Sequence, residues 1–330
     1  MDILLLVFFL LIFIFIRPRA DKLDYLSVDS ALPLRGIMAI AIVLHHMSEK
    51  TTGGVLFPFM QHMGYLIVAV FFFLSGYGLM ISYLSKGSIY LKSFWKKRIL
   101  YLFCIFALVS AVYSIYYLLI GKFKPSLMIA ANSWYIIIQI LLYIIFWFSF
   151  SAFGRKAGIV SVFVFQTILM FVLIWTGKAG IWYISNYGFT AGIIWAEKKE
   201  TMDALLNKHY WICVVVSVAI FALFSALPLF IGGYDICRII SSVAFCLIVV
   251  LILYRIKIVG KLWSWLGGIS LEIYLLHGLV ITLLKNSFHV QNGFLWSVLT
   301  IVISVLIAAP VHKMNEIIAK KCRSIAKKLN

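Results

Sequence analysis

Apolar residues occur along this chain in long runs, which short polar segments separate. Eleven runs have helical length, at residues 2–16, 34–48, 64–85, 99–120, 133–151, 157–176, 181–196, 209–231, 236–254, 265–286 and 293–312. A helix needs about 20 apolar residues to cross a bilayer comfortably, and several of these runs are shorter. The pattern predicts an all-α polytopic membrane protein with about 11 transmembrane helices.

Composition supports lipid as the solvent of this chain. Of its 330 residues, 64% are hydrophobic and 12% are charged, whereas soluble domains have roughly 45–50% apolar and about 25% charged residues. This balance excludes an ordinary cytosolic enzyme, a disordered protein and a nucleic-acid-binding domain. The 5 cysteines are scattered, which argues against a disulfide framework or a zinc site. We therefore expect the lipid bilayer as a partner, no nucleic acid and no metal.

The positive charges predict an orientation. The formal net charge is +18, and most lysines and arginines lie between the apolar runs. With the N-terminus outside, 22 of them fall in cytoplasmic segments and 6 on the outer side, as the positive-inside rule requires. Run 2–16 has no preceding positive charge and no nearby small-residue cleavage site, so we expect an uncleaved anchor. The C-terminus is then cytoplasmic.

Ionisable side chains inside apolar runs are functional candidates, because each costs at least about 2.5–3.5 kcal/mol in a membrane. Arg35 begins run 34–48 near the cytoplasmic face. His46 follows about 16 Å further along the helix and on roughly the same face. Arg35 has a plain alternative as a flanking residue that reaches the interface. His45 points about 100° away from His46, and the residues themselves leave open which histidine is functional.

Run 265–286 contains two more candidates. His277 lies about as deep as His46, so both imidazoles can face one cavity, although the residues alone slightly favour a structural histidine bonded across helices. Glu272 is the single acidic residue deep in a run. A lone buried carboxylate is costly, so Glu272 must be paired or protonated. A structural pair with a buried arginine is as good an interpretation as catalysis.

Two further segments have both a plain and a functional interpretation. Trp134 and Tyr135, followed by Gln139, begin run 133–151 at the predicted outer face. They are either interfacial belt residues or a platform for a sugar. Lys96, Lys97 and Arg98 precede run 99–120. They are either a topology signal or a rim that binds phosphate groups.

These motifs together resemble acyltransferase family 3, the multi-spanning bacterial membrane O-acyltransferases. The resemblance covers roughly residues 26–312. The matching segments, in order, are Leu34-Arg35-Gly36-Ile37 through His46, Phe71 to Tyr77, Lys97-Arg98-Ile99-Leu100, Ser133-Trp134-Tyr135, and Ile269 to His277. The family also carries Arg-x-x-Arg on the basic span. Here Arg98 matches the first arginine, and Tyr101 stands where the second would be.

The resemblance implies three segments and an activity. Residues 1–25 would be an added anchor helix and linker, 26–312 a ten-helix acyltransferase membrane domain, and 313–330 a basic cytoplasmic tail. The activity implied is transfer of an acyl group, usually acetyl from acetyl-CoA, to a hydroxyl of an envelope glycan or lipid-linked sugar. The natural location is the bacterial plasma membrane.

The family pattern also suggests roles for these residues. Its first-helix arginine and histidine fall on Arg35 and His46, and our hypothesis makes His46 the general base, with an acyl-histidine intermediate as a variant. His277 would orient the acceptor or His46, with Glu272 in a supporting pair. Arg35, Lys96, Lys97 and Arg98 would bind the acyl-CoA, and Trp134, Tyr135 and Gln139 the acceptor. The alternative is a transporter or exporter without acyl transfer, although the chain has no convincing internal repeat.

Overall fold

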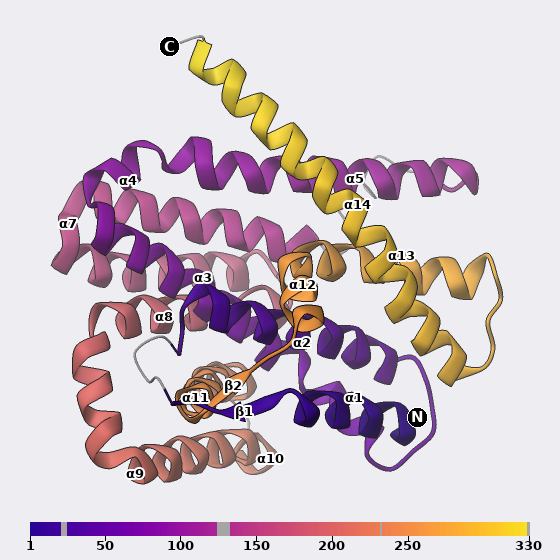
Figure 1. Ribbon diagram of the computed structural model, residues 1–330, viewed down its shortest axis with the longest axis horizontal. Coiled ribbons are helices and arrows are strands. Elements are labelled where there is room, and N and C mark those ends of the chain that lie inside the picture. The colour runs from indigo at the N-terminus through magenta and orange to yellow at the C-terminus, as the bar shows by residue number, and fades with distance from the viewer. Residues whose placement is uncertain (21–24, 124–132, 232, 329–330) are drawn as a thin grey trace.

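The computed structural model describes residues 1–20, 25–123, 133–231 and 233–328 (Figure 1). The long helices are α1 (Asp2–Ile14), α2 (Val28–Ser48), α3 (Gly64–Lys86), α5 (Leu100–Leu119), α7 (Ser133–Trp175), α8 (Tyr187–Glu197), α9 (Lys199–Ala226), α11 (Tyr234–Arg255), α13 (Ser270–Asn286) and α14 (Gly293–Lys328). The short elements are β1 (Ile16–Pro18), η1 (Phe57–His62), α4 (Ser88–Lys92), η2 (Trp95–Ile99), η3 (Gly180–Trp182), α10 (Pro228–Ile231), β2 (Ile256–Ile258) and α12 (Lys261–Gly268). The predicted all-α membrane class is confirmed.

Seven helices in the described ranges are long and apolar enough to cross a membrane. They are α2, α3, η2 with α5, α7, α9, α11 and α14. The pair α12 and α13, bent by 74°, makes an eighth if it counts as one span. With 13 and 11 residues, α1 and α8 are shorter than a typical span. The count of eleven spans and the side of each terminus stay predictions, and Lys22 and Lys124 of the charge tally lie outside the described residues.

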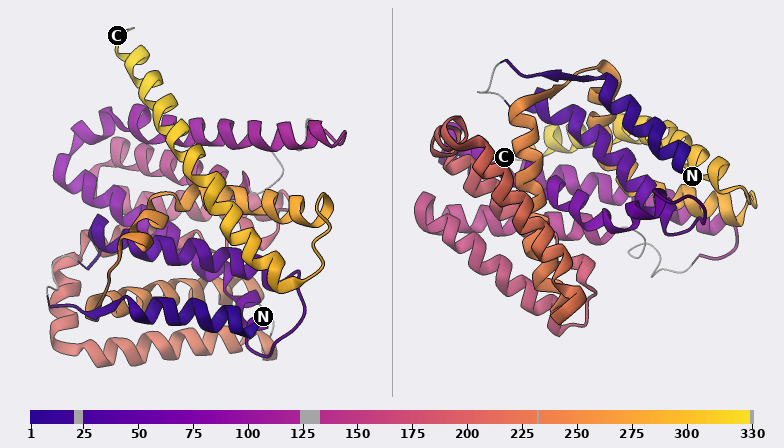
Figure 2. Two further views of the ribbon diagram at one scale, coloured as in Figure 1. Left: turned by 45° about the vertical axis from the view of Figure 1, so that its right-hand side comes forward. Right: turned by 90° about the horizontal axis from the view of Figure 1, so that it is seen from below.

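Helix α7 folds back on itself. Gly154 has φ +69°, inside what is otherwise continuous helix. The rings of Phe148 and Phe165 lie 5.5 Å apart, although 17 residues of straight helix would separate them by about 26 Å. The two halves are therefore antiparallel, as the separate runs 133–151 and 157–176 predict, and they lie side by side in Figures 1 and 2.

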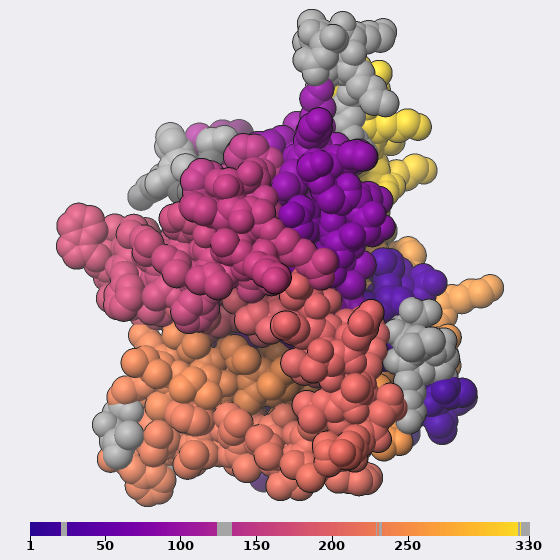
Figure 3. Space-filling model, turned by 90° about the vertical axis from the view of Figure 1, so that its left-hand side faces the viewer, coloured from indigo at the N-terminus to yellow at the C-terminus, as the bar shows by residue number. Residues whose placement is uncertain are grey.

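Two other helices depart from the expected boundaries. Helix α9 bends at His209, whose backbone is not helical (φ −130°, ψ 32°). Figure 3 shows the face that α7 forms together with α9 and α11.

Helix α14 continues to Lys328, so the boundary expected at residue 312 is not the end of a helix. Residues 313–328 are mostly lysine, alanine, isoleucine and other residues that a helix accommodates well.

Two short strands, which the sequence did not predict, hold α1 against the bundle. β1 pairs antiparallel with β2, and Arg19 donates from Nε to the carbonyl oxygen of Leu253 at 2.8 Å. At the other end of α1, the carboxylate of Asp2 accepts hydrogen bonds from three consecutive backbone N–H groups, those of residues 55–57. Three-residue strands have too little periodicity to be recognised in a sequence.

Glycines let the helices around the site approach closely. A Cβ at Gly36 would overlap the carbonyl oxygen of Trp263, and one at Gly267 would overlap that of Leu32, so α2 and α12 touch backbone to backbone. On α8, a Cβ at Gly192 would overlap the carbonyl oxygen of Phe73 on α3. Small residues at helix contacts are the usual means of close packing inside membranes.

Gly192→Ala is expected to lower the free energy of unfolding by about 1–3 kcal/mol, because backbone atoms of α3 must shift. Gly78→Ala on α3 is the matched control, since a Cβ there meets open space. The control substitution should leave the free energy of unfolding unchanged or raise it by up to about 1 kcal/mol, because alanine favours a helix more than glycine does. Thermal unfolding in detergent measures both. Equal effects of the two substitutions would contradict the close packing of α3 and α8.

Candidate functional site

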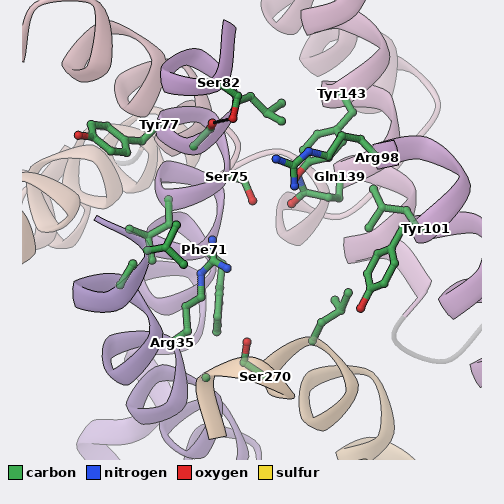
Figure 4. A pocket seen from close by; sticks show the side chains of 18 of the residues that line it. Arg35, Phe71, Ser75, Tyr77, Ser82, Arg98, Tyr101, Gln139, Tyr143 and Ser270 are labelled. Atoms are coloured by element: carbon green, nitrogen blue, oxygen red, sulfur yellow. Dashed lines mark hydrogen bonds between the residues drawn. The ribbon is translucent and has the colours of Figure 1, made fainter. Parts of the chain in front are cut away.

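A cavity of about 770 Å³ opens where six parts of the chain meet. Its walls are the first half of α2, the second half of α3, the start of α5, the first half of α7, the bend between α12 and α13, and Lys199 at the start of α9. Figure 4 shows Arg35 entering it from α2, with Arg98 and Gln139 approaching from across the space. The cavity is large enough for an extended organic ligand.

Arg35 is the unusual residue of this cavity. Its guanidinium lies inside a membrane-length helix and points into the cavity. Among the described residues it forms no hydrogen bond or ion pair, and no carboxylate faces it as a close partner. Arg35 is half-buried, and a charge in such surroundings without a partner is unfavourable. An anionic ligand in the cavity would offset that cost.

Gln139 adds a second group without a partner. Its side chain is 3% exposed, and neither its amide nitrogen nor its amide oxygen has a hydrogen-bond partner in the described residues. Buried polar groups in folded proteins are nearly always hydrogen-bonded. Because Gln139 lines the same cavity as Arg35, a ligand with donors and acceptors would satisfy both.

Only two of the three basic residues that precede α5 line the cavity. Lys97 and Arg98 line the cavity, and Lys96 does not. Arg98 donates from Nε to the hydroxyl of Tyr90 at 3.2 Å, and burial raises the pKa of the Tyr90 phenol. Tyr101, at the position of the family's second arginine, lines the cavity as well. This wall therefore offers a phenol where the pattern has a guanidinium.

A smaller cavity of about 280 Å³ adjoins the first one. Ser82, Lys97 and Arg98 belong to both walls, and Lys86 and Tyr90 line the smaller cavity. The positive charges of Lys86, Lys97 and Arg98 therefore surround one polar annex. Such an arrangement suits phosphate groups, to which arginine binds with two parallel hydrogen bonds and lysine as a point charge.

The two histidines that the sequence places at equal depth do meet. The rings of His46 and His277 are stacked, with centroids 4.9 Å apart and planes inclined by 21°. His277 is buried, and its Nδ1 lies 3.2 Å from the carbonyl oxygen of Ile273. His46 is partly exposed at the end of α2. The pair therefore has one accessible imidazole and one enclosed imidazole.

Glu49 is the partner of His46, and sequence reasoning missed it. Its Oε2 lies 2.9 Å from Nδ1 of His46, and this hydrogen bond lowers the pKa of the Glu49 carboxyl. An ionised carboxylate only accepts, so Nδ1 carries the proton and Nε2 keeps its lone pair. A carboxylate that orients an imidazole in this way is a recurrent catalytic arrangement. The i, i+3 spacing from His46 was the available signal, but Glu49 lies just outside run 34–48.

Glu272 pairs with His312 instead of with His277 or an arginine. Its Oε1 lies 2.9 Å from Nδ1 of His312, and this hydrogen bond joins α13 to α14. Its Oε2 is buried and has no hydrogen-bond partner in the described residues, and the residue also lines the large cavity. His312 escaped sequence reasoning because it is the last residue of run 293–312, where a histidine is an ordinary flank.

His312→Ala is expected to cost about 3–5 kcal/mol of folding free energy, because it leaves the Glu272 carboxylate buried without its partner. Glu316→Gln is the control, since Glu316 is exposed and its Oε1 lies 3.7 Å from Nε2 of His312. That change should stay within about 0.5 kcal/mol. Chemical or thermal unfolding measures both. A mild effect of His312→Ala would contradict a stabilising role for the pair of Glu272 and His312.

The three residues predicted to bind the acceptor do not all line the same cavity. Tyr135 and Gln139 line the cavity of Arg35, whereas the ring of Trp134 lies against Trp182, with centroids 6.5 Å apart. His46 is not among the lining residues either. Arg35 and His46 therefore belong to different parts of the site, although both are on α2.

Two tyrosines connect these parts. Tyr135 and Tyr274 line the cavity, and their rings lie 4.6 Å apart. The ring of Tyr274 also contacts that of His277, with centroids 5.8 Å apart. Ring contacts therefore run from Tyr135 in the cavity wall through Tyr274 and His277 to His46.

Together, these features define a polytopic membrane protein with an internal basic cavity and a separate histidine–glutamate site. The model of the acyltransferase 3 family, described as an acyltransferase domain, matches residues 34–313. The chain belongs to this family of membrane acyltransferases, which confirms the resemblance seen in its motifs. No curated protein and no solved structure gives a significant match to the chain.

Proposed function

We propose that this protein transfers an acetyl group from cytoplasmic acetyl-CoA to a hydroxyl of a cell-envelope polysaccharide or lipid-linked sugar in the bacterial plasma membrane. The observation that carries the proposal is the guanidinium of Arg35, which faces a cavity of about 770 Å³ without a partner among the described residues. A cation in that position favours an anionic ligand. Coenzyme A is an anionic, extended molecule.

Each part of the donor has a matching part of the site. Lys86, Lys97 and Arg98 surround the annex where the phosphate groups of the donor would bind. The amides of the pantetheine arm can satisfy the unpartnered amide of Gln139. Arg35 would then lie near the deeper, thioester-bearing part of the arm. The predicted topology puts the start of α2, and with it this end of the cavity, at the cytoplasmic side.

The chemistry proposed for His46 uses its bond to Glu49. Nδ1 donates to the carboxylate, and Nε2 takes the proton of the acceptor hydroxyl as the oxygen attacks the thioester carbonyl. The C–S bond breaks, and the proton passes to the leaving thiolate, giving an ester and free CoA. In the variant route, Nε2 itself attacks the thioester carbonyl, and the C–S bond breaks to release the CoA thiolate. The sugar hydroxyl then attacks the acetyl carbon, the C–N bond breaks, and the hydroxyl proton passes to the thiolate. His277, stacked on His46, would position its ring.

The tyrosine pair sets a requirement on this mechanism. Tyr135 and Tyr274 line the cavity, and the ring of Tyr274 also contacts that of His277. In the proposed mechanism the thioester reaches His46 past these rings. We propose that donor binding moves them apart, so that the pantetheine arm extends toward the acceptor side of the membrane.

The test uses purified protein in nanodiscs with acetyl-labelled acetyl-CoA, and it follows both binding and thioester loss. Arg98→Ala should weaken binding, because it removes a cavity cation. Lys96→Ala is the matched control: it removes the same charge two residues away, outside the cavity walls. Wild-type affinity in the control and weak binding by Arg98→Ala are the expected results. Equal affinities in all three proteins would contradict this donor site.

A further inference from the structure

A second type of site lies at the end of α2. His45, His46 and Glu49 each place one potential ligand atom within 4.8 Å of the other two. Nε2 of His45 lies 3.7 Å from Oε1 of Glu49, and Nδ1 of His46 lies 2.9 Å from Oε2. Glu49 lies about one helical turn after both histidines, within reach of each, and the rings of His45 and His46 are 4.6 Å apart.

The donor set fits a transition-metal ion. Two imidazoles and a carboxylate are common zinc ligands, with metal–ligand distances of about 2.0–2.2 Å in tetrahedral geometry. Two ligand atoms at that distance from one ion are about 3.3–3.5 Å apart. The observed separations of 2.9 Å and 3.7 Å bracket that value. Small side-chain adjustments would therefore complete three ligands, with water in the fourth position.

His45 is already oriented for this role. Its Nδ1 lies 2.9 Å from the carbonyl oxygen of Met60, so Nδ1 donates and Nε2 presents its lone pair toward Glu49. Metal-bound histidines are usually oriented by such a bond from the other ring nitrogen. The Glu49 side chain is 44% exposed and that of His46 is 31% exposed. An ion from the adjacent solution can therefore reach the cluster.

We infer that His45, His46 and Glu49 bind a divalent transition-metal ion of the Zn²⁺ class, and that this ion inhibits the protein. The inhibitory part rests on the proposed function. Coordination at Nδ1 of His46 replaces the proton that Glu49 accepts, and it takes the carboxylate as a ligand. The hydrogen bond that orients His46 as a base is then lost, and the imidazole bears a cationic metal. The ion and the catalytic arrangement compete for the same atoms.

The binding test uses Co²⁺ as the probe, on tag-free protein in nanodiscs without acyl-CoA. A tetrahedral Co²⁺ site gives a visible d–d absorption band, which Zn²⁺ should abolish by displacement. We expect one equivalent to bind to wild-type protein, with at least about tenfold weaker binding to His45→Gln and Glu49→Gln. His62→Gln is the matched control, since it removes a nearby histidine outside the cluster. Glu49 is exposed, so its variant tests the site even if His45→Gln fails to fold.

Three results overturn parts of this inference separately. Absence of the band in wild-type protein, or equal binding by all variants, overturns the metal site. Full acetyl-CoA turnover by the metal-loaded protein overturns the inhibitory role. Bound Co²⁺ together with no thioester turnover by any metal-free protein overturns the proposed acyl transfer and leaves the metal site standing.

Discussion

His46→Ala is expected to lower thioester turnover by about 10²–10⁴-fold, which is the usual contribution of a positioned general base. Binding of acetyl-CoA should not change, because His46 does not line the basic cavity. The ring of Tyr274 contacts Tyr135 in the cavity wall and His277, and His277 in turn stacks on His46. Release of free thiol measures turnover, and equilibrium binding of labelled acetyl-CoA measures affinity.

Two variants sharpen this result. His62→Ala removes another histidine near the same end of α2 and should leave turnover unchanged. Glu49→Gln should lower turnover as well, because an amide nitrogen facing Nδ1 of His46 favours the tautomer with the proton on Nε2. If His46→Ala turns over at the wild-type rate, His46 is neither the base nor the acyl carrier. The candidate would then be another group that contacts the cavity.

Arg35→Met is expected to raise the thermal stability of the ligand-free protein and to weaken donor binding. Methionine has a similar length, and replacing an uncompensated charge by a packed apolar side chain is often stabilising by about 1–4 kcal/mol. The same change removes charge-assisted hydrogen bonds worth about 1.5–3 kcal/mol, which corresponds to roughly a 10- to 150-fold loss of affinity. Stability and affinity should therefore change in opposite directions.

Arg155→Met is the matched control for this experiment. Arg155 is exposed and forms an ion pair with Glu197, whose Oε2 lies 3.0 Å from its Nε. Its removal should change stability by less than about 1 kcal/mol and leave donor affinity unchanged. Arg35→Met protein that is less stable and binds the donor normally would show a structural role for Arg35. Thermal unfolding with and without acetyl-CoA gives both quantities in one measurement.

Much of the site was predictable from residues that do not belong in lipid. Arg35, Arg98 and Lys97 were singled out because charges in or beside apolar runs are costly, and all three line the cavity. His46 and His277 were paired because their depths match, and their rings are in contact. Such placements can be predicted because depth in a membrane is nearly proportional to position along a helix.

Other features of the site could not be predicted, for a common reason. Trp134 and Tyr135 are neighbours in sequence, yet Tyr135 alone of the two lines the cavity. Glu272 was expected to be paired or protonated, and its partner is His312 on α14. Each of these outcomes depends on how helices rotate and tilt against one another, and the hydropathy of a single run does not specify that rotation.

The sequence by itself determined that this protein lives in a bilayer, where its main helices lie, and that it belongs among the membrane acyltransferases. Hydropathy and charge act on segments of about 20 residues, so they can be read locally. The tertiary structure decided which polar groups meet: Arg35 with Gln139 around one cavity, His46 with Glu49, and Glu272 with a histidine 40 residues away. Those encounters arise from packing between distant parts of the chain, where a buried polar group must find whichever partner the fold brings near.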